Sequence, residues 1–265
     1  QTAPIFDIRV TDGKSPFFLH FDHGDLTGDP LGYMVENRYL RRAVFQRASK
    51  REEIVYLTPV ELIDFNRNVD GVSANLADGR VIHSALIVGS DGRGSYVRRH
   101  AGIEVTQWSY KQTGIVCTVA HDKPHNNIAH EHFYSAGPFA ILPLTGNRSS
   151  IVWTENQEDA EMLVGLSSRE FLNELSDRFG DFLGSLKLVG PRSAFSLNLH
   201  FTKSSTAKRL ALVGDSAHGL HPVAGQGLNM GLRDVAALAE VLVDAARLGL
   251  DIGTLNSLQQ YERWR

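Results

Sequence analysis

An aspartate at the end of an apolar run is the first residue that could do chemistry. The stretch RLALVGD has the composition of a buried strand and ends at Asp215. A carboxylate is costly to bury unless other groups donate hydrogen bonds to it. Ligands of open α/β sheets bind beyond the carboxyl ends of the strands, where a carboxylate can accept hydrogen bonds from sugar or polyol hydroxyls. Asp215 is therefore a candidate ligand-binding residue.

A proline and three glycines follow Asp215 and precede a long helix. Pro222 stiffens this loop, while Gly225, Gly227 and Gly231 leave backbone uncovered for close approach of a ligand. The free amides and positive dipole of a helix N-terminus favour an electron-rich group. For this loop alone, an ordinary strand-to-helix turn with glycines needed only for packing is the alternative explanation.

The helix after this loop is predicted to pack one apolar face on the sheet and to direct its N-terminus at the ligand. The residues of that face recur at steps of three and four: Leu228, Leu232, Val235, Ala239, Leu242 and Ala246.

The same design occurs a second time. The run ALIVGSDG is an apolar strand that ends at Asp91 and Gly92, and a short helix is predicted after it. Two carboxylates at the ends of two buried strands predict a single extended ligand with several polar groups. A repeated design argues against the alternative that the glycines serve only the packing of an ordinary strand-to-helix turn.

The remaining elements predict an interrupted domain. Alternating apolar residues predict a hairpin from 5–10 and 17–21, an extended segment at 31–35 and a helix over 37–50. Short strands are predicted in EEIVYL, VELIDFNRNVD, VSANLADGRVIH and ALIVGSDG, with Asp78-Gly79 as a hairpin turn.

Residues 104–202 are rich in strands interrupted by helical stretches at 157–180, which predicts a largely antiparallel sheet. The predicted class is mixed α/β, a partial Rossmann-like domain interrupted by this sheet. The predicted segments are a substrate-domain hairpin (1–34), two parts of a cofactor-binding domain (35–103 and 203–265) and a substrate-binding sheet (104–202).

Composition excludes several classes of partner. Of the 265 residues 42% are hydrophobic, enough for a core, and 27 basic against 30 acidic side chains give a net charge of −3. No global field attracts nucleic acid, and the arginines of the 37–50 helix are expected on a solvated face. The single cysteine, Cys117, excludes an internal disulfide and fits the cytoplasm. No run is long enough to span a membrane, so any membrane contact is expected to be peripheral.

Two long motifs carry a family resemblance. VGSDGRGSYVRR and LVGDSAHGLHPVAGQGLNMGLRD resemble the downstream signatures of the FAD-dependent aromatic hydroxylases typified by p-hydroxybenzoate hydroxylase. Within that group HPVAGQGLN is most similar to the ubiquinone-biosynthesis hydroxylases, and LGYMVENRYLRRAVF, FAILPL, SSIVWT and YERWR are similar to further segments of that subfamily. The resemblance covers essentially the whole chain.

The resemblance implies FAD as cofactor and NAD(P)H as co-substrate, with reactivity supplied by the flavin and no protein nucleophile. Asp215 would hold the ribityl hydroxyls, and Pro222 would lie beside the reactive edge of the flavin. The implied cofactor contacts are completed by Asn37, Asp91, Gly92, Gly225, Gln226, Gly227, Leu228 and Asn229.

The implied activity is hydroxylation of the aromatic ring of a polyprenyl phenol in ubiquinone biosynthesis, with association to a membrane or a biosynthetic complex. A flavin-dependent isoprenoid reductase and a non-catalytic lipid- or protein-binding subunit are the alternatives. The family begins with a GxGxxG strand-loop-helix, which this chain lacks near its start. We therefore expect a chain truncated at both ends that by itself is inactive and binds FAD weakly or not at all.

Other groupings favour ordinary structural roles. Ser216 lacks the G-x-S-x-G context of a hydrolase nucleophile. No acidic or thiol side chain completes a metal site around His121, His125, His130 and His132, so exposed strand and loop positions are expected for them. His218 and His221 are expected to pack in the loop or to provide polarity beside the flavin. The aromatic residues Trp108, Phe133, Phe139 and Trp153 either belong to the core or line an apolar substrate pocket.

Overall fold

A computed structural model of the chain describes residues 2–13, 15–26, 28–222 and 225–265. The chain forms two compact units, unit 1 (residues 1–55 and 111–197) and unit 2 (residues 56–110 and 198–265). Both units combine helices with sheets, so the predicted mixed α/β class is confirmed. The division into cofactor-binding and substrate-binding segments predicted from the sequence stays a prediction.

Unit 1 is built on a large, mostly antiparallel sheet. Its strands follow the order β14-β9-β12-β11-β10-β2-β3, with β13 pairing beside β9. β10 and β2 pair in parallel, whereas the pairs β10–β11, β11–β12, β12–β9, β13–β9 and β2–β3 are antiparallel. The bounds are β2 (Asp7–Asp12), β3 (Phe18–Asp22), β9 (Val105–His121), β10 (Ile128–Tyr134), β11 (Gly137–Leu144), β12 (Arg148–Asn156), β13 (Leu186–Leu188) and β14 (Ser193–Thr202). The predicted N-terminal hairpin is β2 and β3, so that prediction is confirmed.

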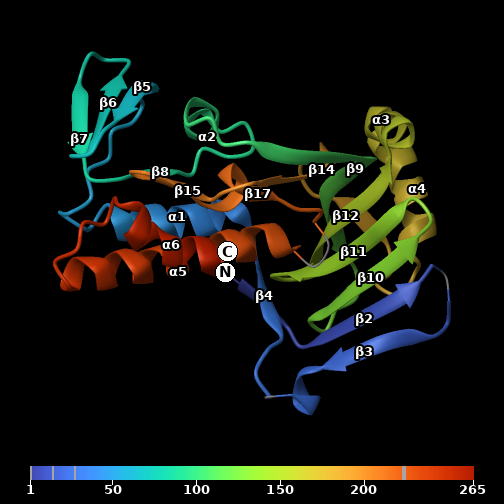
Figure 1. Cartoon of the computed structure of the whole chain (residues 1–265). Helices are drawn as coiled ribbons and strands as arrows, with labels where there is room; N and C mark the ends of the chain where they lie inside the picture. The colour runs from blue at the N-terminus through green and yellow to red at the C-terminus, as the bar shows by residue number, and fades with distance from the viewer. Residues whose placement is uncertain (1, 14, 27, 223–224) are drawn as a thin grey trace. The chain divides into compact units, whose positions relative to one another are not determined.

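Two helices cover one face of this sheet (Figure 1). They are α3 (Gln157–Gly165) and α4 (Ser168–Phe179), within the predicted helical stretch, and α4 begins with a Ser167–Glu170 capping box. Phe139 and Trp153 point from the strands into the core formed with Phe171 of α4. These aromatic residues are therefore core residues, because each is fully buried.

Smaller elements complete unit 1. Strand β1 (Thr2–Ile5) pairs with β4 (Gly32–Val35), η1 (His23–Asp25) follows β3, and the helix predicted over 37–50 is α1 (Asn37–Ala48). The described histidines of the sheet are not exposed as expected, because His121 is buried and the other three are half-buried. The side chain of His121 contacts the Ser149 hydroxyl and the Lys123 carbonyl, which satisfy both ring nitrogens inside the fold.

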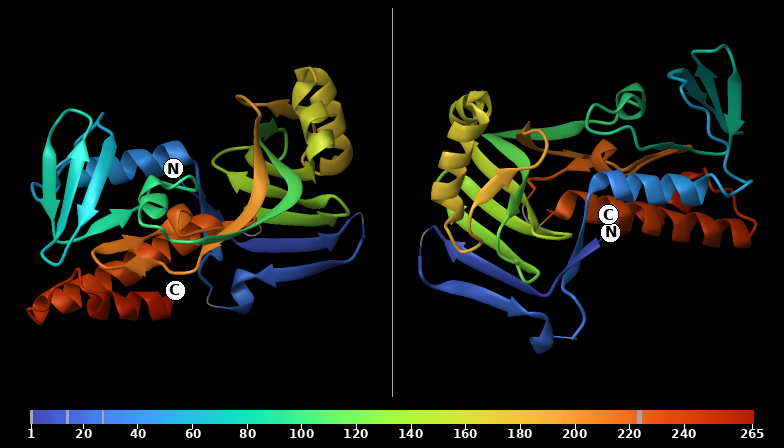
Figure 2. Two further views of the ribbon diagram at one scale, coloured as in Figure 1. Left: turned by 45° about the horizontal axis from the view of Figure 1, so that its top comes forward. Right: turned by 180° about the vertical axis from the view of Figure 1, so that it is seen from behind.

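The described part of unit 2 combines two small sheets with helices (Figure 2). One sheet has the order β5-β6-β7 and the other β15-β16-β8. The bounds are β5 (Leu62–Arg67), β6 (Val72–Leu76), β7 (Val81–Ser84), β8 (Ile87–Gly89), α2 (Tyr96–His100), β15 (Thr206–Ala207), β16 (Leu210–Leu212), η2 (Gly214–Ser216), β17 (His218–Gly219), α5 (Gln226–Arg247) and α6 (Leu255–Trp264). The predicted Asp78-Gly79 hairpin turn joins β6 and β7, as expected.

The long helix α5 packs against α6 and the strand β16. Leu238 and Val241 of α5 share a buried cluster with Tyr261 of α6, whose hydroxyl donates to the Leu212 carbonyl at 2.6 Å. The same strand is buried on its other side against Val97 of α2. Strand β16 is thus covered on both faces, which explains its continuous apolar sequence.

Two sequence predictions about local structure are wrong. The stretch EEIVYL at 52–57 forms no strand. The predicted packing face of α5 is also wrong, because Leu228, Leu232 and Val235 are exposed. The buried face carries Asp234, Leu238, Val241 and Ala245 instead. The buried face of α5 includes the ion-paired Asp234, and a pattern based on apolar residues alone does not include an aspartate.

This corrected face can be tested with a matched pair of leucines in α5. We expect Leu238→Ala to lower the free energy of unfolding by about 2–5 kcal/mol, because it leaves a cavity in the core. We expect Leu232→Ala, whose side chain is 55% exposed, to lower it by less than about 1 kcal/mol. Urea unfolding of both variants provides the measurement, and equal losses would show that the packing face is misassigned.

Candidate functional site

The two predicted loops follow neighbouring parallel strands. β16 pairs with β8 so that Leu212 lies opposite Gly89, the last residue of each strand. Gly214 and Asp215 continue from β16 and form the turn η2, while Asp91 and Gly92 continue from β8. Parallel strands end at the same edge of a sheet, so both loops are placed side by side.

Hydrogen bonds join the two loops directly. The Ser216 hydroxyl donates to the Gly89 carbonyl at 2.5 Å, and the Val213 amide donates to the same carbonyl at 3.0 Å. The buried Arg98 donates to the Ser216 carbonyl and to the Arg93 carbonyl, both at 2.7 Å. The loops after β8 and β16 therefore form one cluster, as two carboxylates serving one ligand would require.

Asp215 lies on the exposed side of this cluster. The Arg93 Nε donates to its Oδ2 at 3.2 Å, and the two side chains are 44% and 46% exposed. A pair at this exposure is worth less than about 1 kcal/mol. The carboxylate of Asp215 is therefore held in place loosely enough to exchange partners with a ligand hydroxyl.

Asp91 is engaged within its own loop. The Ser95 hydroxyl donates to Oδ1 at 2.5 Å and the Val97 amide donates to Oδ2 at 3.1 Å, at the start of α2. Burial opposes ionisation of Asp91, but these hydrogen bonds outweigh it and lower its pKa. The Asp91 side chain thus fixes the loop shape. Gly92, at φ +81°, has open space where a side chain would stand.

A buried aspartate on α5 fixes the second loop. Asp234 is fully buried and accepts from the Gly214 amide at 2.7 Å and contacts the His218 Nε2 at 2.6 Å. The Arg265 Nε lies 2.5 Å from its other oxygen. Burial opposes ionisation of Asp234, but the hydrogen bonds from His218 and Gly214 and the charges of His218 and Arg265 lower its pKa. Asp234 therefore connects α5 with the turn that carries Asp215.

The N-terminus of α5 has no side-chain cap. Gly225 precedes the helix at φ +62°, and its amide donates back to the Pro222 carbonyl at 3.1 Å. Open space lies where β-carbons would stand at Gly225 and Gly227. The first amides of α5 are therefore accessible to an acceptor group.

Gly231 serves packing instead. A β-carbon there would lie 3.3 Å from the Cα of Gly214, so this glycine lets α5 approach the turn closely.

The loop before α5 contributes polar and aromatic groups. Pro222 and His221 are half-buried, and the His221 ring stands edge-on to Tyr110 with the centroids 5.2 Å apart. The Nδ1 of His221 is buried and finds no hydrogen-bond partner among the described residues, and burial lowers the pKa of this histidine. The predicted Val223-Ala224 part of the motif lies outside the described residues. Asn37 begins α1 in unit 1 and is described apart from this cluster.

Comparison with known proteins identifies the family. The profile of the FAD-binding domain matches residues 20–255 of the chain. The chain belongs to the FAD-binding domain family. The predicted resemblance to FAD-dependent hydroxylases is therefore confirmed.

Several relatives in this family have named activities. The ubiquinone hydroxylase UbiL of Rhodospirillum rubrum is 51% identical over 265 residues, all of this chain and 62% of UbiL. The 3-demethoxyubiquinol 3-hydroxylase of Escherichia coli is 35% identical over 92% of the chain and 62% of that enzyme. The chain thus spans a little over three fifths of these relatives. The solved structure of PqsL from Pseudomonas aeruginosa, a probable FAD-dependent monooxygenase, shares the fold at a TM-score of 0.82 and 23% identity, over the whole chain and 74% of PqsL.

The residues present fit a flavin of this family. The uncapped first turn of α5 and the open space at Gly225 and Gly227 suit the edge of a flat ring with carbonyl oxygens. The half-exposed carboxylate of Asp215 suits a chain of hydroxyls, and the unpartnered Nδ1 of His221 offers a further polar contact. The individual roles that the sequence predicts for these residues stay predictions.

Sequence reasoning missed the residues that hold the site together. Arg93 and Arg98 lie inside the motif VGSDGRGSYVRR, and Asp234 lies in the motif that ends in LRD. An acidic residue within the apolar period of a long helix was the available signal for Asp234, because a charge on a buried face needs a partner.

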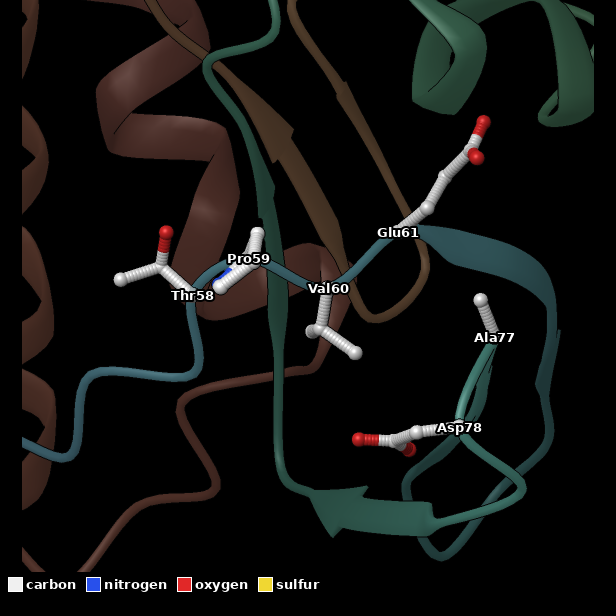
Figure 3. A pocket seen from close by; sticks show the side chains of 6 residues that line it. All are labelled: Thr58, Pro59, Val60, Glu61, Ala77 and Asp78. Carbon is white, nitrogen blue, oxygen red and sulfur yellow. The ribbon is translucent and has the colours of Figure 1, made fainter.

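Two further features lie apart from the site. A surface hollow of about 560 Å³ lies beside β5 and β6, and its carboxylates Glu61 and Asp78 point in different directions (Figure 3). None of the predicted site residues lines this hollow. Among the described residues no three His, Cys, Asp or Glu side chains gather as metal ligands do.

The role of Asp234 predicts a pH-dependent stability. We expect Asp234→Asn to lower the free energy of unfolding at pH 7 by about 3 kcal/mol, because it breaks a buried ion pair. Because folding lowers the pKa of Asp234, the difference from wild type is full above the unfolded value of about 4 and shrinks as the pH falls through the folded value.

Urea unfolding from pH 7 to pH 3 measures this difference. Asp244→Asn, on the exposed side of the same helix, is the matched control with a loss below about 0.5 kcal/mol. Equal stability of the two variants at pH 7 would contradict the role of Asp234.

Proposed function

We propose that the protein is an FAD-dependent monooxygenase that hydroxylates the aromatic ring of a polyprenyl phenol in ubiquinone biosynthesis, using NAD(P)H and O2. The observation that carries this proposal is the joined pair of loops at β8 and β16 beside the uncapped N-terminus of α5. The identity of 51% with a ubiquinone hydroxylase over the whole chain supports the substrate class.

Each element of the site receives a role in this proposal. Asp215 holds the ribityl hydroxyls, and Asp91 and Gly92 shape the neighbouring loop for FAD and NAD(P)H. The amides of Gly225 to Asn229 face the pyrimidine end of the ring, and Pro222 lies beside its reactive edge. The family resemblance also assigns Asn37 of α1 to the cofactor, and that assignment stays a prediction.

The bound flavin supplies the redox chemistry and the activation of oxygen. The protein supplies binding and electrostatics. The dipole and free amides of the first turn of α5 stabilise negative charge on the ring without a side-chain cation. Asp234 connects α5 to the turn that carries Asp215, so the groups that would stabilise this charge are in place before a flavin binds.

We place the enzyme in the cytoplasm, in peripheral contact with a membrane or a biosynthetic complex that delivers the substrate. None of the helices in the described part of the chain is both long and apolar enough to cross a bilayer. A polyprenyl phenol partitions into lipid, so the enzyme must take it from an apolar environment.

The flavin role of Asp215 is testable by cofactor affinity. We expect Asp215→Ala to weaken FAD binding by about 10- to 100-fold, because it removes one or two charge-assisted hydrogen bonds. Equilibrium dialysis and the visible absorption band of the purified flavoprotein measure the loss. Glu240→Ala, on an exposed turn of α5, is the control that keeps its flavin. Unchanged FAD affinity in the Asp215 variant would refute the assignment.

The reaction class is testable by isotope labelling. We expect the flavoprotein, given NAD(P)H and a prenylated phenol under 18O2, to release a product whose new hydroxyl carries 18O, because the inserted oxygen comes from O2. Mass spectrometry of the product provides the measurement. A product that forms equally without oxygen and gains two hydrogens in its tail would identify an isoprenoid reductase instead.

A further inference from the structure

We propose that the face of the unit 1 sheet opposite α3 and α4 is an amphiphile track, on which Glu131 accepts the hydrogen bond of a phenol hydroxyl and strand β3 holds the apolar tail. This inference rests on the proposed function for its substrate class and assigns residues to it. The track is defined by Glu131 with Val10 and Leu19 in one row, and by Ala129 with Ile8 and Phe21 in the next.

Strand register places Glu131 on the face away from the helices. In β10 it lies opposite Val10 of β2 and Ala140 of β11. Residues of β11 and β12 that alternate with this row, such as Phe139 and Trp153, point into the core with α3 and α4. Ala140 is buried but lies outside that core. Glu131 thus belongs to the second face of the sheet.

The Glu131 carboxyl is half-buried and has no partner within the described part of the chain. No described side chain or backbone group makes a hydrogen bond or ion pair with it. Burial, the one cause acting on it, raises the pKa of Glu131 to about 7. Glu131 is not among the buried side-chain groups that lack a partner, so its carboxyl still reaches solvent and is open to a ligand. A ligand hydroxyl that donates to this partly shielded carboxyl would replace the water that it has lost.

The row that contains Glu131 continues to the edge of the sheet. Val10 lies opposite Leu19 of the edge strand β3, and in the next row Ala129, Ile8 and Phe21 lie opposite one another. Neighbouring strands are about 4.8 Å apart, so Leu19 lies about 10 Å from Glu131. That span matches a phenol ring followed by the first isoprene units of a tail.

The edge of the track is apolar and accessible. Leu19 is 60% exposed and Phe21 is 44% exposed, and Phe133 beside Glu131 is also exposed. An edge strand with large exposed apolar side chains marks a contact surface for an apolar partner. The order of groups along the track, one carboxyl and then apolar side chains, is the order of groups in a phenol with an isoprenoid tail.

Other charged groups on this face lie at its ends. By register Asp12 is the last β2 residue on this side, and Arg148 of β12 and Lys187 of β13 occupy the opposite end, where Arg148 pairs with Glu36 at 3.0 Å. The strands β1 and β4 beside β11 carry no charged side chain within their bounds. Glu131 is therefore the acceptor available in the middle of the face.

The experiment measures equilibrium binding of two probes to the flavin-loaded protein by calorimetry: 2-methylphenol, and a phenol with a three-isoprene tail at position 2. We expect Leu19→Ser and Phe21→Ser each to weaken the tailed probe about tenfold and to leave 2-methylphenol unchanged, because each loses about one buried side chain. Phe18→Ser is the matched control, since Phe18 lies on the other face of β3 under Arg9.

Glu131→Gln tests the head of the track, with Asp12→Asn as its control. We expect wild-type affinity for both probes to rise with pH through about 7, as Glu131 ionises and becomes a better acceptor. In Glu131→Gln that rise disappears and both probes bind about tenfold more weakly at pH 8, whereas Asp12→Asn keeps the wild-type profile. Far-UV circular dichroism verifies that every variant is folded.

The outcomes separate this inference from the proposed function. If Leu19→Ser and Phe21→Ser match Phe18→Ser, or if Glu131→Gln keeps the pH profile, the track is refuted while flavin binding and hydroxylation stand. If the full-length protein binds the probes as described but takes up no flavin on reconstitution, the track is supported and the proposed function fails.

Discussion

The ionised, fully buried carboxylate of Asp234 is the interaction on which the site depends. A buried charge is stable only when partners compensate it, and here the Gly214 amide and His218 bind one oxygen while the Arg265 guanidinium forms an ion pair with the other. These donors belong to the turn after β16, to β17 and to the C-terminal helix region. One side chain of α5 therefore fixes the position of three other segments of unit 2.

Because Asp234 joins these segments, the groups predicted to contact the ligand are held in fixed positions. Gly214 is the residue before Asp215, and Gly231 of α5 lies against Gly214, so the start of α5 and the Asp215 carboxylate cannot shift independently. Arg98 and Ser216 then bind this turn to the loop after β8. A ligand at this edge would find a helix N-terminus and a carboxylate already held in place, so little binding energy would be spent on ordering them.

Much of this arrangement was predictable from sequence and part of it was not. Apolar strands followed by Asp-Gly and Gly-Asp turns predicted both loops. The parallel pairing of β8 with β16 places the two loops at the same edge of the sheet, as the sequence predicted. The buried face of α5 was predicted wrongly because Leu228 and Leu232 have the spacing of one helix face but are exposed. The face that is buried contains Asp234. The supposed strand at 52–57 shows the same limit, since apolar composition alone does not provide a pairing partner. Glu131 gave no signal, because its meaning depends on which sheet face it occupies.

Hydrogen exchange of the protein with and without FAD, followed by mass spectrometry, tests the central claim most directly. If Asp234 holds one flavin site, FAD protects the amides of 213–219 and 225–229 together in the wild-type protein, and Asp234→Asn weakens both protections in parallel. Protection of one segment without the other, or protection confined to the sheet of β5, β6 and β7, would contradict the account.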